Sequence, residues 1–127
     1  MRVLLVDDDA DIRLVVRTSI ELAGLAVDVV EAGDGVEALE LMQAEPVHVV
    51  VLDATMPKMD GFTLVTLMAR AGPPLSDTAV IALDGVVEED RWRACELPSS
   101  FTYLSKPCTL DEIIGALRAV GCGPLTS

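Results

Sequence analysis

Hydrophobic and polar positions along this chain follow two alternating patterns. Short, almost continuously apolar runs are typical of strands buried in a parallel sheet, and segments whose apolar residues recur every three or four positions are typical of amphipathic helices. The predicted strands lie near residues 2–6, 27–30, 47–52, 78–83 and 101–104, and the predicted helices near 11–23, 35–44, 62–71, 87–96 and 110–120. Because strand and helix alternate five times with short connections, the sequence predicts a parallel sheet between two layers of helices.

Four of the predicted strands run directly into charged residues. These are Asp7-Asp8-Asp9 after the first strand, Asp53 after the third, Asp84 after the fourth and Lys106 after the fifth. The carboxyl ends of parallel strands open onto one crevice. We therefore expect these side chains to converge on one acidic site that contains one lysine.

Such a group of carboxylates has a chemical requirement that limits its function. Asp7, Asp8 and Asp53 would repel one another unless a cation lay between them, and Mg²⁺ prefers oxygen ligands of this kind. Once the charge is neutralised, one carboxylate can attack phosphorus and form an acyl phosphate. Phosphoryl transfer needs little more than in-line placement and neutralisation of the phosphoryl oxygens, which a metal and Lys106 would supply.

Composition narrows the class of protein further. A chain of 127 residues corresponds to one domain, and its formal net charge of −12 disfavours direct binding to nucleic acid or anionic membranes. No apolar run approaches the roughly 20 residues of a membrane span, and the first strand begins at Met1 without a leader segment, so we expect a cytoplasmic protein. Cys95, Cys108 and Cys122 form an odd set without Cys-x-x-Cys spacing, which argues against disulfides and a zinc site.

Three spaced motifs give the chain a resemblance to a known family. Val6-Asp7-Asp8-Asp9, the segment Leu52-Asp53-Ala54-Thr55-Met56-Pro57-Lys58-Met59-Asp60-Gly61, and Tyr103-Leu104-Ser105-Lys106-Pro107 resemble the receiver domain of two-component response regulators. The resemblance covers residues 1–120 and leaves 121–127 as a short C-terminal tail. It implies a flavodoxin-like, doubly wound (βα)5 fold with a parallel sheet in the order 2-1-3-4-5.

The resemblance also implies roles for individual residues. Asp53 would be the phosphoacceptor, attacking a phosphohistidine on a sensor histidine kinase or phosphotransfer protein. Mg²⁺ would be bound directly by Asp8 and Asp53 and by the backbone carbonyl of Thr55, with Asp7 acting mainly through a water molecule. Lys106 would pair with the phosphoryl group.

Two further positions of the last motif would serve switching. Pro107 would hold Lys106 in place through a cis peptide bond, and Tyr103 would be the aromatic switch residue. The face formed by the last two helices and the strand between them would contact a downstream protein. The protein would be no enzyme beyond catalysing its own phosphorylation and dephosphorylation.

One position departs from the family pattern. Where receivers place a Thr or Ser that donates to the phosphoryl oxygen, this chain has Asp84. A carboxylate there cannot donate when ionised, and it would add repulsion of about 4 kcal/mol at 4 Å for an effective dielectric near 20. Asp84 could turn outward, be protonated, or occupy the phosphoryl position and bind Lys106.

Two alternatives follow from this departure and from the one tryptophan. The chain could be a receiver-like interaction module that works without phosphorylation because Asp84 replaces the switch hydroxyl. Trp92, on the predicted helix 87–96, could pack internally or anchor a protein interface.

Overall fold

The structure is a computed structural model that describes residues 1–54, 56, 59–85 and 89–123. Its five strands form one parallel sheet in the order β2-β1-β3-β4-β5, which confirms the flavodoxin-like topology. In chain order the elements are β1 (Arg2–Val6), α1 (Ala10–Leu22), β2 (Asp28–Ala32), α2 (Gly35–Ala44), β3 (Val49–Asp53), α3 (Gly61–Ala71), the 3-10 helix η1 (Leu75–Asp77), β4 (Ala79–Asp84), α4 (Glu89–Ala94), β5 (Phe101–Ser105) and α5 (Leu110–Ala119).

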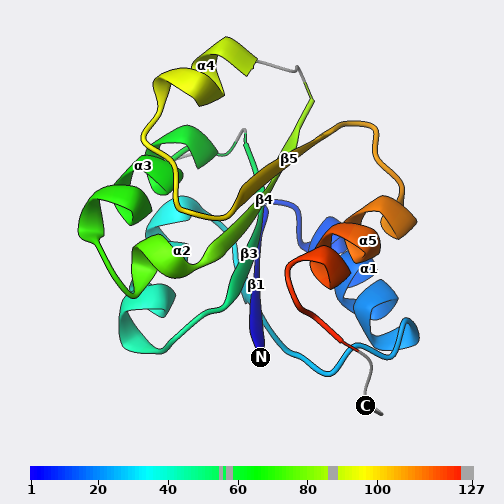
Figure 1. Cartoon of the computed structure of the whole chain (residues 1–127). Coiled ribbons are helices and arrows are strands. Elements are labelled where there is room, and N and C mark those ends of the chain that lie inside the picture. Colours follow the sequence, from blue (N-terminus) through cyan, green and yellow to red (C-terminus); the bar gives the residue numbers. More distant parts are fainter. Residues whose placement is uncertain (55, 57–58, 86–88, 124–127) are drawn as a thin grey trace.

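The sheet lies between two layers of helices (Figure 1). α1 and α5 cover one face, and α2, α3 and α4 cover the other. Every residue of the central strand β3 is buried; Val49 and Val51 face the first layer, while Val50 and Leu52 face the second. Since a central parallel strand is covered on both faces, its almost continuous apolar run follows directly from its position.

Polar side chains mark where the helices begin. Asp9 caps α1, Asp34 caps α2 and Asp60 caps α3, each by accepting from a backbone N–H of the first turn. Thr109 and Glu112 form a reciprocal capping box at the start of α5, as the sequence predicted. The caps fix the helix entries that follow the carboxyl ends of β1 and β5, where the charged residues lie.

The structure differs from the sequence expectation at a few boundaries. β2 extends to Ala32, which is buried and pairs with Val6, and α4 ends at Ala94, before the predicted residue 96. Residues 86–88 lie outside the described part. The 3-10 helix η1 was not predicted, because the preceding Gly72-Pro73-Pro74 indicated only that α3 ends. Among the described helices, none has the length and apolar character needed to cross a bilayer.

Candidate functional site

Three carboxylates meet at the carboxyl end of the sheet. Asp7 follows β1 and Asp53 ends β3; both are buried, with 6% and 9% of their surface exposed, whereas Asp8 is exposed. One oxygen from each carboxylate lies within 4.8 Å of the other two. β1 and β3 are paired neighbours, so the parallel sheet brings these acids together.

The environment of Asp7 disfavours its charged form. Burial raises the pKa of Asp7 above its ordinary value, and the nearby charges of Asp53 and Asp8 raise it further. The Asp9 backbone N–H, which donates to Asp7 Oδ1 at 2.9 Å, and the Lys106 ammonium oppose the shift without cancelling it. A cation bound between the carboxylates would favour the ionised form.

A lysine from the other side of the sheet approaches the same group. Lys106 Nζ lies 3.0 Å from Asp53 Oδ1. The Lys106 backbone N–H donates to the Asp84 carbonyl at 2.8 Å, and the Lys106–Pro107 peptide bond is cis. Lys106, which follows β5 and is bonded to the end of β4, thus places one positive charge beside the Asp53 carboxylate at the end of β3.

The donor set fits a hard divalent cation. Asp7, Asp8 and Asp53 offer only oxygen ligands, they carry more negative charge than Lys106 balances, and they are close enough to share one ion. Mg²⁺ commonly takes one or two carboxylates together with waters and phosphate oxygens. The remaining expected ligand, the Thr55 carbonyl, lies outside the described residues.

Asp84 is turned toward the helical layer that contains α4. Its side chain is 4% exposed, and its Oδ2 accepts a hydrogen bond from Trp92 Nε1 at 3.0 Å. In this structure the Asp84 side chain is buried and does not face solvent. Among ion pairs between described residues, Lys106 is joined to Asp53 and not to Asp84, so the arrangement with Asp84 on Lys106 is absent as well.

Trp92 and Tyr103 both pack in the core on the α4 side of the sheet. Trp92 is 2% exposed and packs between Phe62 and Phe101, with ring centroids 4.0 and 5.0 Å away. Internal packing is thus the arrangement that the structure shows for Trp92. Tyr103, on β5, is half-buried against the same core.

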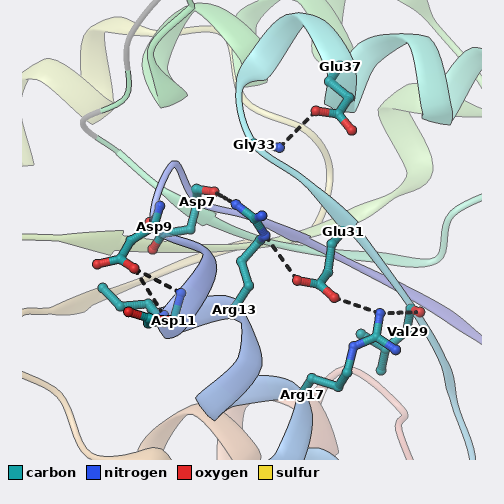
Figure 2. A network of polar contacts seen from close by, with 10 residues as sticks. Asp7, Asp9, Asp11, Arg13, Arg17, Val29, Glu31, Gly33 and Glu37 are labelled. Atoms are coloured by element: carbon teal, nitrogen blue, oxygen red, sulfur yellow. Dashed lines mark hydrogen bonds and ion pairs between the residues drawn. The ribbon is translucent and has the colours of Figure 1, made fainter.

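Sequence reasoning missed a cation beside the acidic cluster. Figure 2 shows Arg13 of α1 between Asp7 and Glu31. Its Nη1 donates to the Asp7 backbone carbonyl, and its Nε lies 3.0 Å from Glu31 Oε1. Glu31 also pairs with Arg17, at 2.9 Å through its other oxygen. No local signal identifies this network, since Glu31 belongs to β2 and reaches α1 only through the tertiary fold.

Gly61 also has a role that the sequence pattern did not assign. Its N–H donates to the Ala54 carbonyl at 2.9 Å, next to Asp53. A Cβ at Gly61 would lie 2.6 Å from Leu52 Cδ1 and 2.9 Å from Ala54 Cα. The start of α3 therefore packs against the end of β3 at a distance that only glycine allows.

The topology and the acidic pocket at its switch point define a class of protein, the flavodoxin-like receivers. Over residues 3–118 the chain matches the response regulator receiver domain family, and it belongs to that family. It is 36% identical over 121 residues to response regulator MprA of Mycobacterium leprae and 35% identical to that of Mycobacterium avium; each match covers 94% of this chain and 50% of the relative. The chain thus spans about half the length of these relatives.

Solved structures give the same result. The receiver domain of Francisella response regulator 1452 is 30% identical with a TM-score of 0.79, and the match covers 94% of both chains. The chemotaxis response regulator CheY4 of Vibrio cholerae is 28% identical with a TM-score of 0.80, over 94% of this chain and 97% of that one. Receiver domains of this family typically depend on Mg²⁺ at the phosphorylation site and generally are not true enzymes.

Proposed function

We propose that this chain is the phosphoacceptor module of a two-component His-to-Asp phosphorelay, phosphorylated on Asp53. The observation that carries the proposal is the environment of Asp53, which ends the central strand with Lys106 at 3.0 Å and two further carboxylates within 4.8 Å. Asp53 Oδ attacks the phosphorus of a phosphohistidine. The new P–O bond forms as the P–N bond breaks, and the histidine ring nitrogen takes the electron pair.

The residues around Asp53 orient its carboxylate and compensate negative charge during this step. Lys106 compensates negative charge on the transferring phosphoryl oxygens and orients the Asp53 carboxylate beforehand. Asp7, Asp8 and Asp53 would hold Mg²⁺, with the Thr55 carbonyl as a further proposed ligand. When bound, the ion supplies charge neutralisation between carboxylates and phosphate. The chemistry of the chain is limited to its own phosphorylation and dephosphorylation.

The phosphodonor partner is a sensor histidine kinase or a phosphotransfer protein, and a groove beside the site suits its approach. The groove has a volume of about 620 Å³ and extends from Lys106 between α1 and α5. Its rim includes three apolar side chains that are substantially exposed, namely Ile12, Val15 and Leu110. Because the groove adjoins Lys106, a protein seated in it would lie next to Asp53.

The remaining features of the proposal follow from the family and the charge. Residues 1–120 form the receiver and 121–127 a C-terminal tail. The face of α4, β5 and α5, with Tyr103 as the switch residue, contacts a downstream protein. The net charge of −12 disfavours direct contact with nucleic acid or anionic membrane, and the protein acts in the cytoplasm.

Intact-mass spectrometry tests the proposal. The chain is incubated with Mg²⁺ and acetyl phosphate beside Asp53→Asn and Asp84→Thr. We expect one phosphoryl adduct that is absent in Asp53→Asn. An adduct in Asp84→Thr but none in the natural chain would instead favour the receiver-like module that works without phosphorylation.

A separate variant tests the docking groove. Val15→Glu places a charge in the groove without changing Asp7, Asp8, Asp53 or Lys106, so transfer from a cognate kinase should slow while labelling by acetyl phosphate stays unchanged. Equal slowing with both donors would show that Val15 affects the chemistry or the fold and not docking.

A further inference from the structure

The hydrogen bond between Trp92 and Asp84 joins α4 to the end of β4. Trp92 is the only tryptophan of the chain, and Phe62 and Phe101 hold its ring in the core. Its Nε1 donates to Asp84 Oδ2 at 3.0 Å, and both side chains are buried. An indole N–H is a donor only, so its hydrogen bond suits the carboxylate at this position.

The backbone places Asp84 next to the end of β5, where Lys106 follows. Leu83, the preceding residue, pairs with Asp53 in the sheet, and the Asp84 carbonyl accepts from the Lys106 N–H at 2.8 Å. The Lys106 side chain runs alongside, since its Cδ lies 3.9 Å from the position of a Cβ on Gly85. Rotation about χ1 between staggered rotamers redirects the Asp84 carboxylate without moving the strand.

We propose that Trp92 is a positioning residue for the phosphorylation of Asp53, because its indole N–H holds the Asp84 carboxylate on the α4 side of the sheet and away from Lys106. This inference rests on the proposed function of Asp53. Without the indole donor, rotation of the Asp84 carboxylate toward the Lys106 ammonium becomes more favourable. Lys106 is then shared between two carboxylates, and the phosphoryl group meets additional negative charge.

A double-mutant design separates this role from simple packing. The rate of phosphorylation by acetyl phosphate is measured by intact mass in the natural chain, Trp92→Phe, Asp84→Ala and the double variant. Trp92→Phe should slow labelling at least about tenfold, since a hydrogen bond to a charged group is worth roughly a decade or more in an equilibrium. Adding Asp84→Ala to Trp92→Phe should restore the rate to that of Asp84→Ala alone.

A matched control and two contrary results complete the rate experiment. Phe101→Leu removes a ring contact of Trp92 and leaves the indole donor, so its labelling rate should equal that of the natural chain. Unchanged labelling in Trp92→Phe would overturn the proposal. So would a double variant as slow as Trp92→Phe, because the defect would then arise from packing and not from the Asp84 carboxylate.

A crystal structure of Trp92→Phe tests the same inference without phosphorylation. We expect an Asp84 carboxylate oxygen within about 4 Å of Lys106 Nζ, the distance of an ion pair. An Asp84 carboxylate still on the α4 side would overturn the positioning role. Absence of labelling in the natural chain would count against the proposed function alone, since this structural result does not depend on it.

Discussion

Replacing Asp7 with asparagine should stabilise the metal-free protein. Asp7 is buried, and one of its carboxylate oxygens lies within 4.8 Å of a carboxylate oxygen of Asp8 and of one of Asp53. Asparagine keeps the size of the side chain and an oxygen that can accept the Asp9 N–H, which now donates to Asp7 Oδ1 at 2.9 Å. The substitution therefore removes a buried charge and little else.

The geometry sets the size of the effect. Two unit charges 4.8 Å apart, the largest separation within the cluster, repel by about 3.5 kcal/mol at an effective dielectric near 20. The exposure of Asp8 and the attraction of Lys106 reduce it. We expect the free energy of unfolding to rise by about 1–2 kcal/mol at pH 7, or Tm by about 3–8 °C for a domain of this size.

The pH dependence has a defined sign. Burial, together with the charges of Asp53 and Asp8, raises the pKa of Asp7 in the folded state above its ordinary value of 3.8. The folded state then binds the proton more tightly than the unfolded state, so the natural chain loses stability as pH rises from 3.8 through the folded pKa. The advantage of Asp7→Asn should be full at pH 7 and shrink as pH falls toward 4.

Urea unfolding followed by Trp92 fluorescence measures this difference, with chelator present and again with excess Mg²⁺. Mg²⁺ should stabilise the natural chain by mass action and stabilise Asp7→Asn much less. Asp28→Asn, at an exposed position at the start of β2, is the control and should change stability by less than about 0.5 kcal/mol. A metal-free Asp7→Asn that is less stable at pH 7, or an advantage that does not depend on pH, would refute the electrostatic reasoning.

Three other substitutions give measurable effects by thermal or urea unfolding. Gly61→Ala should cost about 1–3 kcal/mol, because its Cβ would overlap Leu52 and Ala54, and it should also slow labelling of Asp53; full stability would contradict the close packing. Arg13→Gln should cost about 1–2 kcal/mol by removing the donor to the Asp7 carbonyl, and should strengthen Mg²⁺ binding in calorimetry because it removes a positive charge beside the carboxylates; unchanged affinity would separate Arg13 from the site. Thr109→Ala should cost about 0.5–2 kcal/mol through loss of the α5 cap, with Asp53 labelling unaffected.

Much of the fold could be predicted because local pattern and tertiary environment agree. The run at 47–52 is apolar throughout because β3 is buried on both faces, and Thr109 with Glu112 indicates the start of α5 by a local hydrogen-bond pattern. The boundaries of β2 and the C-terminal end of α4 were less accurate. Both elements depend on neighbours that are distant in sequence: Ala32 joins the sheet by pairing with Val6, and α4 is anchored by the burial of Trp92.

Part of the candidate site could be predicted from the sequence as well, and part could not. The approach of Asp7, Asp53 and Lys106 follows from strand ends in a parallel sheet. The orientation of Asp84 could not be predicted, since its partner Trp92 is on a helix whose position depends on packing against Phe62 and Phe101. A side-chain direction set by tertiary contacts leaves no signature in the spacing of residues.

Chemical trapping of the acyl phosphate tests the central claim most directly. The chain is phosphorylated with Mg²⁺ and acetyl phosphate, reduced with borohydride, digested and mapped by mass spectrometry. Borohydride converts a phosphorylated aspartate to homoserine, so the account predicts homoserine at position 53 and unmodified Asp7, Asp8 and Asp84. Homoserine at another aspartate, or at none, would contradict it.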